Sequence, residues 1–142
     1  MEPELLRQLS AIYPAQVVEL LKTARHTGCL EPHHARGAHR TANGEHIEFR
    51  LRLAGDTILR MQFTFEGKAV LLAASEVACR ICEGLTVVQA LRLCTEEAIA
   101  GELGNLPDSE LWSLMQVREA LRLCLMQALQ VVREPWKGPY VQ

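Results

Sequence analysis

The chain has 142 residues, of which 49% are hydrophobic and 23% are charged, and its formal net charge is −2. This length suits one ordinary domain with a single core, and we expect one domain over residues 1–142. The nearly balanced charge gives no general attraction to nucleic acid or to an anionic membrane, so neither is expected as a partner. The N-terminal residues lack a signal-peptide pattern and no apolar run could span a bilayer, which favours a cytoplasmic location.

The first part of the chain predicts two helices and a long loop. Residues 1–12 have a helical pattern that breaks at Tyr13-Pro14, because the residue before proline avoids the helical region. Pro14 suits the first turn of a second helix that ends near Thr23. The following stretch, Arg25–Gly44, has no hydrophobic periodicity and holds four of the five histidines. We predict a loop there, and connections of this length are usually functional or disordered.

The central stretch predicts a β-hairpin over about 46–65, followed by a helix. In the first strand, apolar and polar residues alternate with the period of two expected when one sheet face is buried. Ala54-Gly55-Asp56-Thr57 supplies turn chemistry. The apolar positions of the two strands are Ile47, Phe49, Leu51, Leu53, Leu59, Met61, Phe63 and Phe65. From Ala69 to Glu83 the chain is rich in small apolar residues, and its only charges there form one narrow helical stripe at Glu76, Arg80 and Glu83.

Three further helices are predicted towards the C-terminus. Thr86 and Gln89 form a capping box before a helix at 87–93, and Thr95 caps a helix that begins with two glutamates. Apolar residues at spacings of three and four predict a long last helix over about 110–132, capped by Asp108 or Ser109. Residues 133–142 are predicted to be a tail. The whole pattern indicates an α+β fold in which a small antiparallel sheet packs against helices.

The order of hairpin, glycine corner and small-residue helix resembles the IscU/NifU N-terminal family of iron–sulfur cluster assembly scaffolds, over roughly residues 13–130. The family's Phe-x-x-x-Gly-Cys corner reads Phe63-Thr64-Phe65-Glu66-Gly67-Lys68 here. Its Pro-x-Cys-Gly-Asp motif aligns with Thr41-Ala42-Asn43-Gly44-Glu45, and its Leu-Pro-Pro-x-Lys-x-His-Cys motif aligns with the segment that ends in Trp112-Ser113. The family's three cysteine ligands are therefore Asn43, Lys68 and Ser113 in this chain, and its aspartate is Glu45.

The resemblance implies a non-enzymatic scaffold-like protein of iron–sulfur cluster assembly, for metal or cluster binding or delivery, whose standard cluster site is degenerate. The alternative is a metal-free interaction or regulatory protein derived from the scaffold fold. For the cofactor, the alternatives are an iron–sulfur cluster, zinc or none. Protein partners from an iron–sulfur assembly pathway are implied. The family's basic chaperone-recognition segment is acidic here, at Asp108-Ser109-Glu110, so that chaperone is not expected to bind.

Two groups of residues could replace the lost ligands. If a metal binds, His39 or His46 together with Glu45 would be its nearest ligands, since imidazole suits zinc, iron and copper. If none binds, Lys68 would substitute for the charge of the metal, and we expect its ammonium to form an ion pair with Glu45.

The five cysteines are not expected to form structural disulfides. Cys79 and Cys82 form a single Cys-x-x-Cys pair inside a helix, where packing is the expected role. The remaining alternative is a thiol enzyme that uses this pair, and the reactivity of the two thiols would distinguish it.

Overall fold

The computed structural model describes residues 2–134, so the predicted tail lies outside the described residues from residue 135 onward. Three strands, β1 (Ala35–Arg40), β2 (His46–Ala54) and β3 (Thr57–Glu66), form one antiparallel sheet in that order. The helices are α1 (Pro3–Ile12), α2 (Ala15–Thr23), α3 (Ala69–Cys82), α4 (Val87–Leu93), α5 (Glu96–Leu103) and α6 (Leu111–Arg133), and a 3-10 turn, η1 (Asp108–Glu110), precedes α6. The predicted α+β fold, with its hairpin packed against helices, is confirmed.

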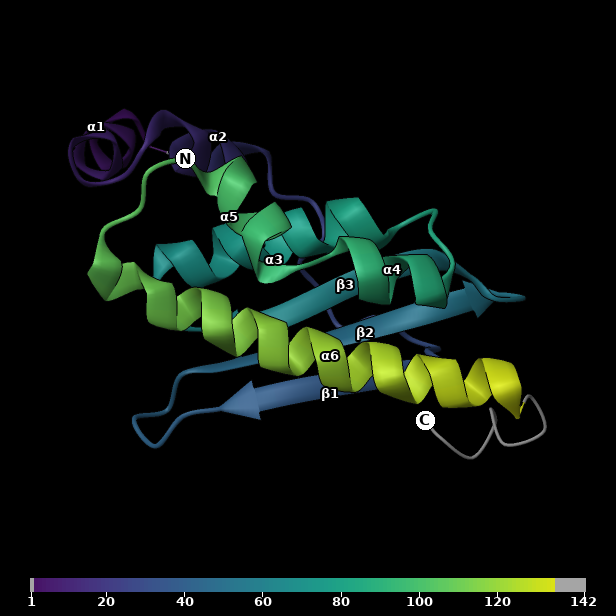
Figure 1. Cartoon of the computed structure of the whole chain (residues 1–142). Coiled ribbons are helices and arrows are strands. Elements are labelled where there is room, and N and C mark those ends of the chain that lie inside the picture. Colours follow the sequence, from purple (N-terminus) through teal and green to yellow (C-terminus); the bar gives the residue numbers. More distant parts are fainter. Residues whose placement is uncertain (1, 135–142) are drawn as a thin grey trace.

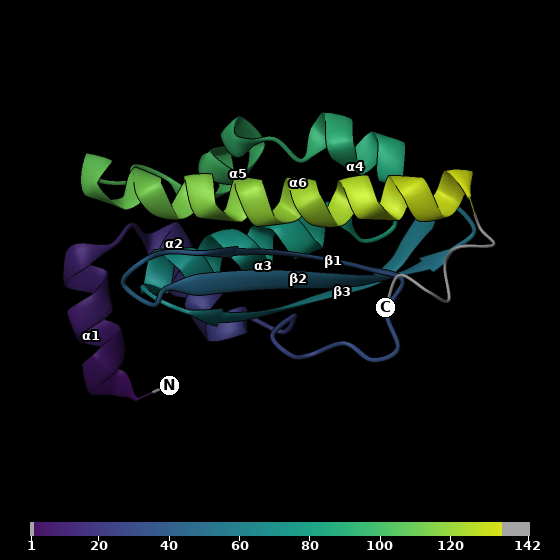
Figure 2. The same cartoon turned by 90° about the horizontal axis from the view of Figure 1, so that it is seen from below.

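The helices cover one face of the sheet. In Figure 1 the long helix α6 crosses β1 and β2, and α3 lies on β3. The short helices α4 and α5 pack on α3 and α6. Figure 2 shows the chain between α2 and β1 running along the opposite side of the sheet. There Arg52 donates hydrogen bonds to the carbonyl oxygens of Glu31 and Pro32, at 3.1 Å each, so this segment is fastened to the sheet.

The hairpin buries the face that its alternation predicts, with one exception. Ile47, Phe49 and Leu51 of β2 are completely buried, and the rings of Phe49 and Phe63 pack with centroids 6.2 Å apart. The pairing of β2 with β3 shifts register between Arg52 and Leu53 of β2, which turns Ile58 inward and leaves Leu59 of β3 55% exposed. The expected inward position of Leu59 is therefore wrong, because a β-bulge exchanges the two faces at the start of the strand.

The loop predicted over 25–44 is wrong in part, because residues 35–40 form the edge strand β1. Its inward residues Ala35 and Gly37 are small, so they produce no hydrophobic periodicity. Their size lets α6 approach the strand closely. A Cβ atom on Gly37 would lie 2.2 Å from the backbone nitrogen of Cys124 and 2.4 Å from the carbonyl oxygen of Ala120. Beside this contact, Gln127 Oε1 of α6 accepts a hydrogen bond from the backbone N–H of Arg36, at 2.7 Å.

The predicted helix starts are confirmed for the two short helices and not for α6. Thr86 makes a complete capping box with Gln89, and the side chain of Thr95 accepts from the N–H of Ala98. The expected side-chain cap of α6 at Asp108 or Ser109 is absent in the described chain. Those residues form the 3-10 turn η1, whose geometry continues directly into α6.

The contact at Gly37 predicts that this glycine cannot be replaced. Gly37→Ala should lower the free energy of unfolding by about 3 kcal/mol, because the added methyl group meets backbone atoms that cannot turn aside. Urea unfolding followed by circular dichroism measures the change. Gly101→Ala in α5 is the matched control, since its Cβ meets no atom within 4 Å and alanine favours a helix by about 1 kcal/mol. Equal unfolding free energies for wild type and Gly37→Ala would contradict this account of the β1–α6 contact.

Candidate functional site

The positions that the family resemblance assigns to cluster ligands lie at one end of the sheet. Asn43 and Glu45 are in the turn between β1 and β2, Lys68 is the residue before α3, and Ser113 is in the first turn of α6. Figure 1 shows these three segments at the same end of the molecule. Ser113 is only 3% exposed, whereas Asn43 and Lys68 are exposed. The fold thus gathers the segments that carry the aligned positions.

The acidic and basic members of this set do not pair. Neither Glu45 nor Lys68 has an ion-pair partner within 4.0 Å in the part of the chain that the structure describes, so the predicted ion pair is wrong. A Cβ atom on Gly67 would lie 3.2 Å from Glu45 Oε2, which places this carboxylate beside the corner before α3. Lys68 precedes α3 as its N-cap residue with an extended backbone, and its side chain is exposed.

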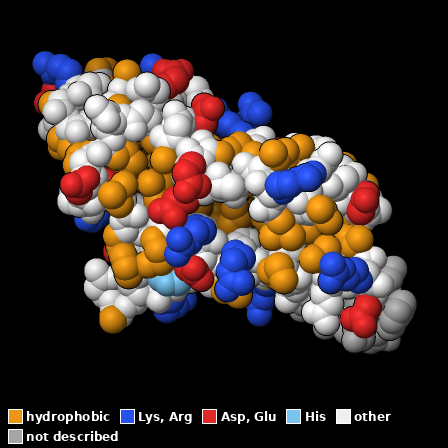
Figure 3. Space-filling view, viewed as in Figure 1, with side chains coloured by type: hydrophobic (Ala, Val, Ile, Leu, Met, Phe, Trp, Pro, Cys, Tyr) orange, Lys and Arg blue, Asp and Glu red, His pale blue; other side chains and the backbone are white. Residues whose placement is uncertain are grey.

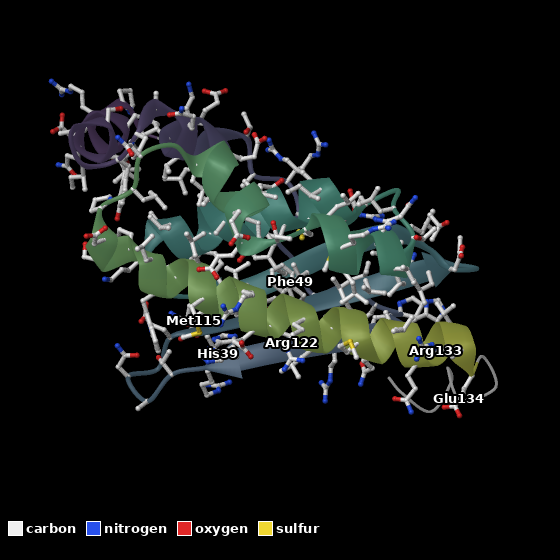
Figure 4. The ribbon with its side chains drawn as sticks, viewed as in Figure 1. His39, Phe49, Met115, Arg122, Arg133 and Glu134 are labelled. Atoms are coloured by element: carbon white, nitrogen blue, oxygen red, sulfur yellow. The ribbon has the colours of Figure 1, made fainter. Side chains whose placement is uncertain are left out.

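The two histidines proposed as metal ligands face opposite sides of the sheet. His39 is paired with the buried Ile47, and directly paired residues share one face, so His39 points towards the helices. Figure 4 shows it on β1, the strand that packs against α6. His46 is paired with Arg40 and points to the other face. One ion therefore cannot bind both imidazoles in this arrangement.

The donor groups at this end do not fit an iron–sulfur cluster. Such clusters are held by thiolates, and the aligned positions carry an amide, an ammonium group and a hydroxyl. Within residues 2–134, no three His, Cys, Asp or Glu side chains come together in a way that could hold a metal ion. The hydroxyl of Thr41 is hydrogen-bonded to Asn43 Oδ1 and also accepts from the N–H of Glu45 at 3.1 Å, so the turn satisfies its own polar groups.

A charge cluster, formed by His26, Glu76, Arg80 and Glu83, lies elsewhere in the fold, and its His26 and Glu76 are buried whereas Arg80 is exposed. Glu76 is completely buried on α3, and its Oε1 accepts from the backbone N–H groups of Arg25 and His26, at 3.0 Å each. Its Oε2 accepts from Arg80 Nε at 2.8 Å and lies 2.5 Å from His26 Nδ1. Arg80 also donates to the carbonyl oxygen of Thr23 at 2.9 Å, so the carboxylate and its neighbours hold the end of α2.

His26 lies between two carboxylates. Its Nδ1 faces Glu76, and its Nε2 lies 2.7 Å from Glu83 Oε1. Because carboxylates only accept hydrogen bonds, the ring satisfies both of them only when each nitrogen carries a proton. The other oxygen of Glu83 accepts from the N–H of Met61 at 2.9 Å, and Phe63 N–H donates to the carbonyl oxygen of His26 at 2.9 Å. This cluster therefore joins α3, β3 and the segment after α2.

The hydrogen bonds of Glu76 outweigh its burial. Burial acts to raise the pKa of this carboxyl, but hydrogen bonds from Arg80, His26 and Arg25 hold the pKa below its ordinary value of 4.5. The sequence placed Glu76, Arg80 and Glu83 on one stripe of the helix but did not identify His26, about fifty residues earlier, as their partner. The available signal was the placement of a carboxylate in an otherwise apolar helix, since such a group must find a partner.

Four of the cysteines are buried, and Cys29 is exposed. Burial raises the pKa of Cys79 well above its ordinary value, and burial likewise raises the pKa of Cys124. The pKa of Cys82 is raised by a hydrogen bond with Cys94 and then by burial. These thiols stay protonated and are poor nucleophiles. The packing role expected for Cys79 and Cys82 agrees with this environment.

The charge cluster predicts a defined acid dependence of stability. Glu76→Gln should lower the free energy of unfolding at pH 7 by about 3 kcal/mol or more, because Arg80 loses its buried counter-charge. In wild type, the contribution of Glu76 is present above its unfolded pKa and is lost as the pH falls below about 4.5 towards the lower folded pKa. The variant should therefore lose less stability between pH 6 and pH 3. Urea titrations across this range test the difference, with the exposed Glu66→Gln as control, and parallel curves would contradict it.

The thiol environments predict that one cysteine reacts quickly in the native protein. Ellman's reagent at pH 8 should titrate Cys29 rapidly, and the other four should react only on unfolding, because the reagent cannot reach a buried thiol. Cys29→Ser should remove the rapid phase. Fast reaction of Cys79 or Cys82, located by mass spectrometry, would instead support the thiol-enzyme alternative.

Among the described residues, no helix has both the length and the apolar character needed to cross a membrane.

Comparison with solved structures identifies the fold. An N-terminal domain of a NifU-like protein from Brucella abortus superimposes with a TM-score of 0.66 at 16% sequence identity, over 86% of this chain and 97% of that one. A putative iron–sulfur cluster assembly scaffold protein for the SUF system, from Fervidobacterium islandicum AW-1, superimposes with a TM-score of 0.55 at 19% identity, over 92% and 96%.

At these identities the structures show a shared fold. No curated protein sequence matches the chain. The sequence model of the NifU-like N-terminal domain matches residues 12–130. This range includes the β1–β2 turn, the corner before α3 and the start of α6, which carry the aligned positions. The chain therefore belongs to the NifU-like N-terminal domain family.

Proposed function

We propose that this protein serves iron–sulfur cluster assembly as a non-enzymatic, scaffold-like protein whose standard cluster site is degenerate. Membership of the family and the likeness to a putative assembly scaffold support the pathway. The observation that carries the proposal is that the fold gathers at one end the segments with Asn43, Lys68 and Ser113, the residues that the resemblance aligns with the family's thiolates. The protein keeps the architecture of a scaffold without the ligands.

The charges at this end support a site that functions without metal. Three thiolates and a carboxylate would repel one another unless bound cations compensated them. Here Asn43 and Ser113 are neutral, and Lys68 offsets the charge of Glu45 at longer range than an ion pair. Because no cation is needed for stability, the contribution of this chain to assembly would come from contacts with pathway proteins.

Metal binding by one histidine is the second candidate function. The Nδ1 atoms of His39 and His46 are both buried and lack a hydrogen-bond partner in the described structure. An imidazole nitrogen in that state can accept a metal ion. Since the two rings face opposite sides of the sheet, zinc would use only one of them, with Glu45 and donors from solvent or a partner.

Cysteine replacements test whether the aligned positions define the old cluster site. Asn43→Cys, Lys68→Cys and Ser113→Cys should be made singly and together, then reconstituted with iron and sulfide under anaerobic conditions. The triple variant should gain iron, sulfide and visible absorption, because it restores three thiolates at one end. Lys68→Cys alone should gain none. A stable cluster in that single variant would show that other residues already supply ligands, and the degenerate-site proposal would fail.

Zinc titration separates the second candidate from the first. If one histidine binds zinc, calorimetry of wild type should show a single site that either His39→Ala or His46→Ala removes, while the other variant and the control His34→Ala retain it. Glu45→Gln should weaken the same site. Zinc binding that survives both histidine substitutions would eliminate this candidate.

A further inference from the structure

The sheet has one covered edge and one open edge. Along β3, the backbone N–H of Gly28 donates to the carbonyl oxygen of Phe63 at 2.9 Å, and the N–H of Ile58 donates to that of Leu85 at 2.8 Å. Other segments of the chain therefore occupy the outer hydrogen-bonding groups of β3. The opposite edge is β1, which Figure 1 shows as the outermost strand. Among the described strands, β1 is thus the one that can accept a further strand.

The outward backbone groups of β1 belong to Arg36, Ala38 and Arg40. Along an antiparallel strand, successive residues alternate between bonding to the neighbouring strand and facing away from it. The N–H of Arg36 donates to Gln127 of α6, and the N–H of Thr41 donates across the turn that leads into β2, which fixes this alternation. Within residues 2–134, the N–H and carbonyl groups of Ala38 and Arg40 make no hydrogen bond. These groups can form a ladder with an added strand.

The sheet face away from the helices is basic beside this edge. Glu48 of β2 lies opposite Ala38 and reaches Arg36 at 3.7 Å, whereas Arg40 has no ion-pair partner in the described chain. A carboxylate on the outer side of Ala38 would lie diagonally opposite both arginines, within reach of their long side chains. The charged residues of this face are five arginines and three glutamates, namely Arg36, Arg40, Arg50, Arg52, Arg60, Glu31, Glu48 and Glu66.

The other face of an added strand would lie beside α6. Gln127 reaches the edge at Arg36, so residues one turn apart on the same side of α6 follow that edge. One turn before Gln127 is Leu123, which is 46% exposed, and one turn earlier is Glu119, which pairs with Arg118. Figure 3 shows hydrophobic side chains over α6, interspersed with Lys, Arg, Asp and Glu side chains. The edge thus offers arginines on one face and an apolar contact on the other.

We propose that the β1 edge binds an extended segment of a partner protein in which acidic and apolar residues alternate. The backbone groups of Ala38 and Arg40 would form the ladder, as in other complexes made by strand addition. The acidic side chains would face Arg36 and Arg40, and an apolar side chain would contact Leu123. This binding does not depend on the proposed function, because it uses none of the aligned ligand positions.

Two other occupants of the edge are less suitable. A second copy of β1 would bring the same arginines to the edge, and like charges across a strand pair are destabilising. Residues 135–142 contain Pro135 and Pro139, and proline lacks the N–H that a ladder requires. An acidic segment from another protein meets neither objection.

Fluorescence anisotropy with three labelled peptides tests the proposal. One peptide alternates valine with glutamate, and a second alternates valine with lysine. The third repeats the glutamate peptide with methylated backbone nitrogens, which removes the ladder donors and leaves the charges. Wild type should bind the glutamate peptide about tenfold or more tightly than either of the others. Amide shifts measured by NMR with the glutamate peptide should change at Ala38 and Arg40 and not along β3.

Variants of the full chain separate the ladder from the charge. Ala38→Pro removes an outward N–H and leaves the β1–β2 hydrogen bonds in place, so it should weaken binding of the glutamate peptide about tenfold. Ala38→Thr keeps the donor and is the matched control. Arg40→Glu should reverse the preference, so that the lysine peptide binds more tightly than the glutamate peptide. Circular dichroism checks that each variant folds.

The proposal is overturned if wild type does not bind the glutamate peptide, if it binds the methylated peptide equally well, or if Arg40→Glu leaves the preference unchanged. Sedimentation velocity tests the second copy as occupant. A wild-type dimer that Ala38→Pro abolishes would show that β1 pairs with itself, and this too would overturn the proposal.

Discussion

The direct contact between the backbones of β1 and α6 determines the geometry of the fold. Gly37 has no side chain to separate them, so Ala120 and Cys124 of α6 lie against the strand itself. This contact fixes the position of α6 along β1, and with it the position of Ser113, about two turns before Ala120, relative to the turn that carries Asn43 and Glu45. Sheet packing and the location of the aligned ligand positions therefore depend on the same residue.

The charge cluster around the buried Glu76 performs a comparable task beside α3 and β3. The buried carboxylate of Glu76 has lost its hydrogen bonds to water. The backbone N–H groups of Arg25 and His26 and the side chains of Arg80 and His26 replace them, and this compensates for its burial. Through Thr23 and Met61 the cluster also fixes the end of α2 and the edge of β3. The segment that follows can then cross to the far face of the sheet. The Glu76 carboxylate thus organises long-range structure that apolar packing alone would leave less defined.

Features governed by neighbours in sequence could be predicted well. The alternation of β2, the caps at Thr86 and Thr95 and the extent of α4 depend on local spacing, and each is found in the structure. Features governed by distant contacts could not. Ala35 and Gly37 produce no hydrophobic signal because their small size is what α6 requires, and the bulge that exposes Leu59 is set by pairing with β2.

The candidate site shows the same division. The resemblance placed Asn43, Lys68 and Ser113 in segments that the fold does gather. It could not give side-chain directions, so the expected ion pair of Lys68 with Glu45 is absent among the described residues, and His39 and His46 lie on opposite faces. The loop pattern gives His26 no partner, although its ring lies between Glu76 of α3 and Glu83 directly after α3. The directions of these side chains depend on strand register and on where each helix starts. Both are determined by tertiary contacts.

We propose that this chain retains the scaffold fold while its cluster site has lost the thiolate ligands. The most direct measurement is the iron, acid-labile sulfide and zinc content of the wild-type protein, purified anaerobically without chelator, together with its visible absorption spectrum. The account predicts iron and sulfide far below one equivalent per chain and no absorption near 400 nm. Iron and sulfide in stoichiometric amounts, with a cluster spectrum, would contradict it.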